Sequence, residues 1–156
     1  MSFELRTQAP ILAAAVLFAF TLPARAAAID DTIPDQQGMA QLELRASQAK
    51  PREQCYLYTQ LVHVMTEKAG KEIGAGDTEH ANATLRQIDV YAHIIQNNVV
   101  KDAKGLKEAE MLMRHTTFRL AQFLHLVPEE DKQTVQATLK QLDQVNAQLL
   151  NQVLKY

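Results

Sequence analysis

Hydrophobic residues recur at spacings of three and four along most of this chain, which is the pattern of helices with one apolar side. Four such stretches follow one another at about residues 52–73, 78–100, 106–126 and 128–156, and short polar or glycine-containing connections separate them. The positions on their inward faces are, in order, Cys55, Tyr58, Val62, Met65, Ala69 and Ile73; Ala81, Leu85, Ile88, Ala92, Ile95 and Val99; Leu106, Ala109, Met113, Thr116, Leu120, Phe123, Leu124 and Val127; and Val135, Leu142, Leu149, Val153 and Tyr156.

Helices of this kind bury their apolar faces against one another. The pattern therefore predicts an all-α fold, with an antiparallel up-and-down four-helix bundle over residues 51–156. The alternative is an irregular stack of helical hairpins, because residues 69–85 resemble the turn of a tetratricopeptide hairpin. No second copy of that turn occurs at a fixed period, which favours the bundle.

The first 26 residues have the organisation of a secretory signal peptide. Arg6 precedes an apolar run from Ile11 to Leu22, Pro23 ends that run, and Ala24-Arg25-Ala26 matches a signal-peptidase site. The run is shorter than the roughly 20 apolar residues that span a bilayer, which disfavours the alternative of an uncleaved anchor. We expect export to the periplasm or the medium, with no stable membrane span after cleavage.

Residues 27–50 lack a clear period and are predicted to form a flexible leader, with a possible short helix over Met39–Gln48. Pro51 then favours a helix start, since proline fits the first helical turn. Cys55 is the one cysteine of the chain, so it forms no internal disulfide. Its place on an apolar helix face favours burial over pairing with another molecule.

The charge balance narrows the class of partner. The chain has 16 Lys and Arg residues and 18 Asp and Glu residues, which gives a formal net charge of −2. That balance argues against a nucleic-acid partner, which favours a basic surface. The hydrophobic content of 47% argues against an intrinsically disordered chain.

Local motifs for catalysis and for common cofactors are absent from the sequence. It holds no Cys-x-x-Cys-His, Glu-x-x-His, phosphate-binding loop or nucleophile elbow. Its size and expected compartment resemble those of the periplasmic b-type bundle cytochromes, which hold haem between a methionine of the first helix and a histidine of the fourth. Met65 could serve as the first ligand, but the fourth stretch has no histidine. We therefore predict neither catalytic residues nor a bound cofactor.

Two histidine–carboxylate pairs offer an alternative, which is a zinc or copper site. His63 and Glu67 are one helical turn apart, as are Asp89 and His93, and both pairs lie off the main apolar faces of adjacent predicted helices. If the two pairs meet at a shared edge, they supply ligand atoms of the types that zinc and copper bind. The competing interpretation is two exposed hydrogen-bonded pairs.

Surplus apolar residues favour an interaction role. The second and third predicted helices carry additional apolar residues away from their main faces, namely Val90, Ile94, Met111, Phe118 and Leu126. Such residues either contact a partner or lie under another part of the chain, such as the short N-terminal helix. The sequence thus predicts an exported, non-enzymatic protein-interaction module, binding an unknown protein or a second copy of itself. Metal binding is the alternative function.

Overall fold

The computed structural model describes residues 28–99 and 102–155, and these ranges contain five helices and no strand. The predicted all-α class is therefore confirmed. The predicted signal peptide, residues 1–26, lies outside the described residues. None of the described helices is both long enough and apolar enough to cross a membrane.

The helices agree closely with the hydrophobic pattern, and one of them lies in the predicted leader. They are α1 (Gln36–Gln48), α2 (Pro51–Gly74), α3 (Thr78–Asn97), α4 (Leu106–Leu124) and α5 (Lys132–Val153).

Side-chain and backbone signals explain where these helices begin. The Asp35 carboxylate accepts a hydrogen bond from the Gly38 amide at 2.7 Å and caps α1. Pro51 occupies the first turn of α2. Gly76, at φ 73°, makes the turn between α2 and α3 in a conformation that favours glycine.

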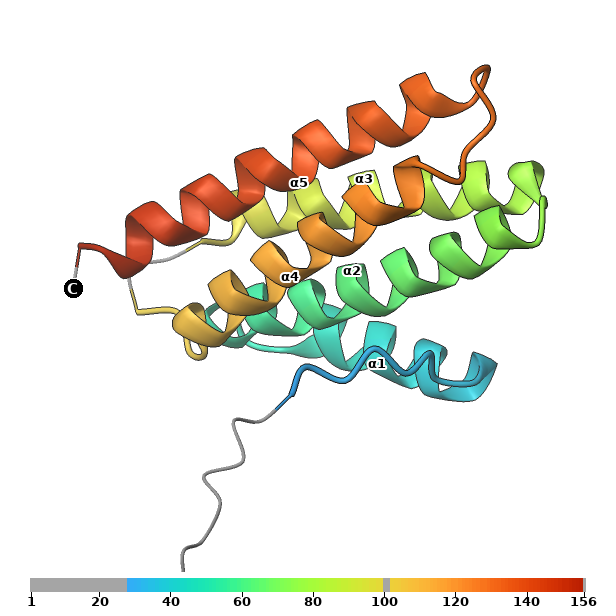
Figure 1. Cartoon of the computed structure of the whole chain (residues 1–156). Helices are drawn as coiled ribbons and strands as arrows, with labels where there is room; N and C mark the ends of the chain where they lie inside the picture. The colour runs from blue at the N-terminus through green and yellow to red at the C-terminus, as the bar shows by residue number, and fades with distance from the viewer. Residues whose placement is uncertain (1–27, 100–101, 156) are drawn as a thin grey trace, which may run out of the picture.

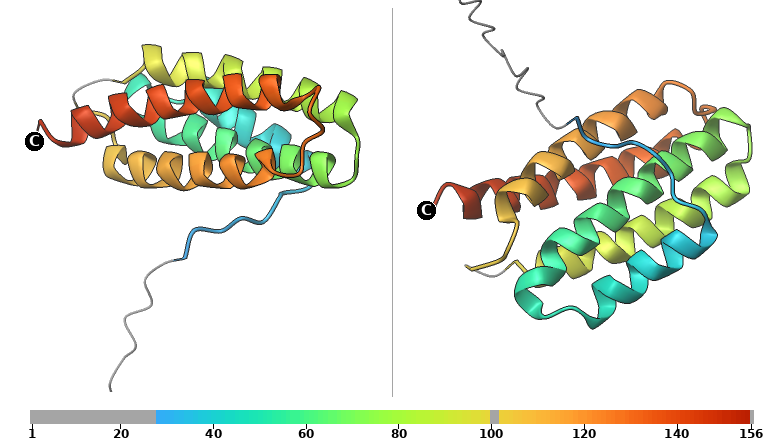
Figure 2. Two further views of the ribbon diagram at one scale, coloured as in Figure 1. Left: turned by 45° about the horizontal axis from the view of Figure 1, so that its top comes forward. Right: turned by 90° about the horizontal axis from the view of Figure 1, so that it is seen from below.

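The four long helices form two antiparallel hairpins that lie side by side (Figures 1 and 2). In one hairpin α2 packs against α3, and in the other α4 packs against α5. Between the hairpins α2 packs against α4 and α3 against α5, so that α3 and α4 are diagonal and α2 runs parallel to α4. In the simplest up-and-down bundle each helix would instead pack against the next one in the chain.

Contacts just before α4 join its beginning to α2. The Lys104 amide donates to the Arg52 carbonyl oxygen at 2.7 Å. Gly105, at φ 71°, lies so close to Tyr56 that an added Cβ would be 3.2 Å from the tyrosine ring. These contacts place the beginning of α4 beside the beginning of α2.

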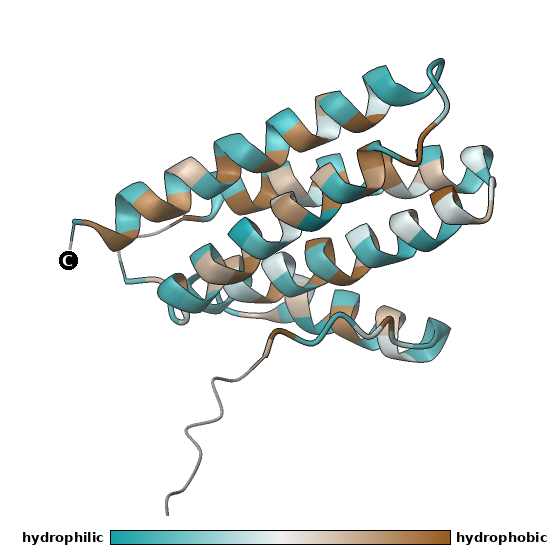
Figure 3. Ribbon diagram, in the orientation of Figure 1, coloured by the Kyte–Doolittle hydropathy of each residue, from teal (hydrophilic) through white to brown (hydrophobic). Residues whose placement is uncertain are grey.

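The core lies between the two hairpins, with apolar residues on the inward faces (Figure 3). Helix α2 is the most central, since it contacts α1, α3 and α4. It therefore buries polar side chains as well, including those of His63 and Glu67. Cys55 is fully buried, and this burial raises the pKa of its thiol to about 11.

The residues before α2 pack on the helices. Ala46 of α1 is fully buried, and Glu43 of α1 accepts a hydrogen bond from the hydroxyl of Tyr91 in α3. Residues 28–35 precede α1 as an extended segment that runs over α2 and α4 (Figure 2, right). We call residues 28–35 the strap. It brings residues from near the N-terminus to the junction of the two hairpins.

Candidate metal centre

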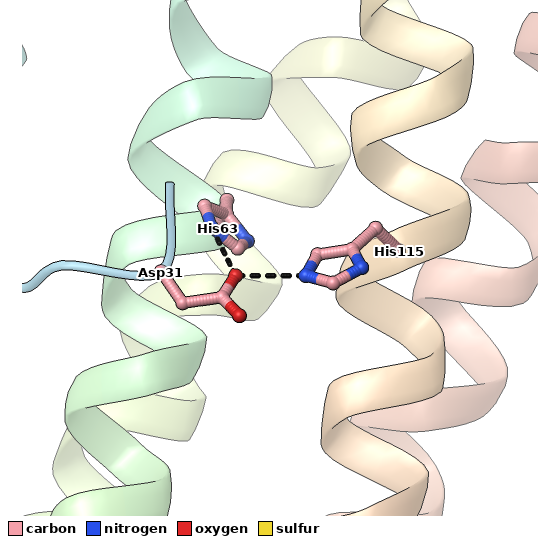
Figure 4. Close-up of side chains that lie close together, drawn as sticks. All are labelled: Asp31, His63 and His115. Carbon is pink, nitrogen blue, oxygen red and sulfur yellow. Dashed lines mark hydrogen bonds and ion pairs between the residues drawn. The ribbon is translucent and has the colours of Figure 1, made fainter. Parts of the chain in front are cut away.

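Three potential metal ligands from distant parts of the chain meet where the strap crosses α2 and α4. They are Asp31 of the strap, His63 of α2 and His115 of α4, and one ligand atom of each lies within 4.8 Å of the others. Oδ1 of Asp31 is 2.7 Å from Nε2 of His115 and 3.3 Å from Nε2 of His63. Figure 4 shows the carboxylate between the two imidazole rings.

The three side chains differ in exposure. His63 is 3% exposed, because both α4 and the strap cover it. His115 is partly buried and Asp31 is exposed. The centre therefore has a rigid inner ligand on α2 and an outer edge that solvent and ions can reach.

The hydrogen bond with Thr116 determines which ring nitrogen of His63 carries the hydrogen. The Thr116 hydroxyl donates to the Leu112 carbonyl oxygen at 2.7 Å, and its oxygen lies 3.1 Å from Nδ1 of His63. Because the hydroxyl hydrogen of Thr116 points at the Leu112 carbonyl oxygen, the Thr116 oxygen is free to accept a hydrogen bond from Nδ1–H of His63. A neutral His63 then has its lone pair on Nε2, on the side of Asp31.

The surroundings of Nε2 consist of acceptor oxygens. It lies 3.1 Å from the Asp30 carbonyl oxygen and 3.3 Å from Oδ1 of Asp31. Burial lowers the pKa of His63, and this effect exceeds the opposing effects of the Asp30 carbonyl and the nearby carboxylates. A proton on both ring nitrogens is therefore disfavoured, and a metal ion would fill the place between Nε2 and the carboxylate.

A different proton arrangement satisfies the same groups without a metal. If the Thr116 hydroxyl turns and donates to Nδ1, the single ring hydrogen of His63 lies on Nε2 and points at Asp30 and Asp31. The cluster is then a hydrogen-bonded lock between the strap and α2.

Beside the three ligands, Glu67 and Arg119 form a two-pronged ion pair between α2 and α4. Nε and Nη2 of Arg119 each donate to one Glu67 oxygen, both at 2.7 Å. These hydrogen bonds are the main reason why the pKa of Arg119 is raised. Because Glu67 neutralises Arg119, the Asp31 carboxylate leaves one net negative charge at the centre when both histidines are neutral, which favours a cation.

The distances suit a small divalent ion with mixed nitrogen and oxygen ligands. Tetrahedral zinc, with bonds of about 2.0–2.2 Å, places its ligand atoms roughly 3.3 Å apart. The gap between Asp31 and His63 has that length, at 3.3 Å. The 2.7 Å gap between Asp31 and His115 is a direct hydrogen bond, which would widen on metal binding.

The structure does not bring the two predicted histidine–carboxylate pairs together. His63 and Glu67 are buried against α4. Asp89 and His93 lie against α5, where Asp89 accepts from the Thr138 hydroxyl at 3.4 Å and Nδ1 of His93 is 3.3 Å from the Gln141 amide nitrogen. Each pair occupies the edge of its helix that meets the neighbouring hairpin.

Sequence reasoning missed Asp31 and His115. Asp31 lies in a segment without a period, so no pattern connected it with a helix. His115 had a detectable signal, because it precedes Arg119 by one helical turn, as His63 precedes Glu67. When two such helices run side by side in the same direction, the two histidines lie next to each other, and the acidic residue of one helix lies next to the basic residue of the other.

The five predicted interaction residues do not form one surface. Met111, Phe118 and Leu126 belong to α4 and the turn after it, and they are 45%, 60% and 61% exposed. Val90 is 51% exposed but lies on α3, diagonal to α4. Ile94 is partly buried and packs against the core.

The strap, α2 and α4 thus each contribute one ligand to a centre that no local motif marks. A His, His, Asp set can bind a transition-metal ion and leave a coordination position open. The chain matches no protein-family model, and no curated protein or solved structure is significantly similar to it.

Proposed function

We propose that this chain is an exported, non-enzymatic helical protein that binds a divalent transition-metal ion, zinc or copper(II), through Asp31, His63 and His115. The observation that carries the proposal is the buried Nε2 of His63, which faces two acceptor oxygens while Thr116 occupies Nδ1. The residual negative charge at Asp31 supports it. The signal-peptide pattern of residues 1–26 supports export to the periplasm or the medium.

We further propose that α2–α5 serve as one four-helix bundle in which the two hairpins share a core. The support is that His63 and His115 come from different hairpins. A metal ion on both histidines would link those hairpins directly. The bundle would therefore set the distance between the two nitrogen ligands.

Isothermal titration calorimetry of the purified protein with zinc and with copper(II) at pH 7.5 tests metal binding. We expect a 1:1 complex with a dissociation constant that is roughly micromolar or lower. Copper(II) is expected to bind more tightly than zinc, as it does at most nitrogen and oxygen sites. His115→Gln and Asp31→Asn should each weaken binding at least roughly tenfold, since each removes a direct ligand.

Two matched variants control for general effects. His125→Gln removes an exposed histidine just after α4, and Asp102→Asn removes an exposed carboxylate in the loop before α4. Both should bind metal as the unaltered protein does. Binding weaker than millimolar in the unaltered protein, or equal losses in control and ligand variants, would rule out this centre.

An interaction role is the second proposal, and the exposed side chains of α4 and of the turn after it favour it. Large apolar groups such as Phe118 and Leu126 are 60% and 61% exposed. In analytical ultracentrifugation, we expect the weight-average molar mass of the unaltered protein to rise with concentration. In Phe118→Ser it should return towards the mass of the monomer. Leu44→Ser, an exposed site on α1, is the control and should change nothing. A monomer at every concentration would contradict self-association.

A further inference from the structure

The strap faces two different environments. Its Asp31 carboxylate points at the two histidines (Figure 4). Residues on either side of Asp31, among them Asp30 and Thr32, line a groove with a volume of about 540 Å³. One short extended segment thus contributes both a candidate metal ligand and a wall of a cavity.

The groove lies between the strap, α1, α2 and the first half of α4. Its lining is mainly apolar. On the strap side it is lined by Ile29 and Pro34, and on the helical side by Leu42, Val64, Met111 and Leu112. Removal of the strap would take away one wall and expose this lining to solvent.

Few polar contacts hold the strap on the helices. In the part of the chain that the structure describes, each hydrogen bond or ion pair between the strap and α2 or α4 involves either the Asp31 carboxylate or the Asp30 carbonyl oxygen. The partners are His63, His115 and Arg119. All of these contacts converge on the candidate metal centre.

We propose that metal binding pins the strap in place as one wall of the groove, so that the bound ion controls whether the groove is formed. This inference rests on the proposed metal-binding function. Without the ion, the polar contacts that order the strap are those of Asp30 and Asp31 with His63, His115 and Arg119, and they act against the entropy of a free segment. A metal ion that binds only when Asp31 is in place shifts the equilibrium towards the docked strap.

A nitroxide spin label at Ile29→Cys reports strap mobility directly. Ile29 lines the groove, and the native Cys55 is fully buried with a raised thiol pKa, so the label attaches to the new cysteine. We expect zinc alone to make the slowly moving component of the spectrum the major one, and a chelator to reverse the change.

Variants in the same labelled background connect this change to Asp31. In Asp31→Asn the label should stay mobile at zinc concentrations that saturate the labelled protein in which Asp31 is kept. Asp102→Asn, which removes an exposed carboxylate in the loop before α4, should respond to zinc as the parent does. Circular dichroism of each variant checks that the helices are intact.

Calorimetry on the same samples separates the two proposals. If zinc binds but the label stays equally mobile, the strap inference is overturned and metal binding stands. If zinc does not bind, the proposed function fails and the strap inference fails with it. Zinc-dependent immobilisation that is lost in Asp31→Asn and kept in Asp102→Asn supports both.

Discussion

The Arg119→Met variant is expected to lose about 3 kcal/mol of the free energy of unfolding, because it leaves a buried carboxylate without its partner. Glu67 is 6% exposed, and both of its oxygens accept hydrogen bonds from Arg119 at 2.7 Å. Methionine has a similar length and keeps the apolar contacts of the stem, so the loss reports mainly the unpaired charge. Urea unfolding followed by circular dichroism at pH 7.5 measures the change.

Lys104→Met, in the turn before α4, is the matched control. Nζ of Lys104 is 3.8 Å from Oε1 of Glu53, and the two side chains are 71% and 41% exposed. An exposed pair of this kind contributes at most about 1 kcal/mol. The double variant Glu67→Leu/Arg119→Met should recover much of the lost stability, since it removes both charges. Equal, small losses in Arg119→Met and Lys104→Met would contradict the importance of the buried pair.

Gly70→Ala is expected to cost roughly 1–3 kcal/mol, although alanine is the better helix former. Gly70 is buried in α2, where an added Cβ would be 2.3 Å from two ring atoms of Phe123. Phe123 must then rotate away, and it would leave the Arg119 guanidinium carbon that lies 4.8 Å from its ring centroid. The glycine thus lets α4 place its aromatic ring directly on α2.

Gly74→Ala provides the comparison for this variant. Gly74 is the last residue of the same helix, and an added Cβ there would meet nothing within 4 Å. Alanine should leave stability unchanged or raise it by up to about 1 kcal/mol. Thermal and urea unfolding of the two variants should therefore shift in opposite directions or differ clearly in size. If Gly70→Ala is as stable as Gly74→Ala, the close approach of Phe123 does not limit this position.

The sequence determined the helices of this protein because their signals are local. Apolar residues at helical spacing located the four long helices, and residues such as Cys55, Leu85, Met113 and Leu142 are fully buried as their pattern predicts. Pro51 begins α2 as expected. Hydrophobic spacing, proline and capping groups act within a few residues of their own positions, so no knowledge of the neighbours is needed.

The tertiary structure alone decided which helices are neighbours and which polar groups are buried. A hydrophobic pattern shows that a helix has an apolar face but not which helix covers it. In the structure α2 packs against α4, and Lys104 and Gly105 at the end of a loop contact the beginning of α2. That packing buries His63 and brings His115 to it. Asp31 joins them because an extended segment, which carries no periodic signal, crosses both helices. The candidate metal centre is thus a product of packing between distant segments, and packing is a property that spacing along the chain does not encode.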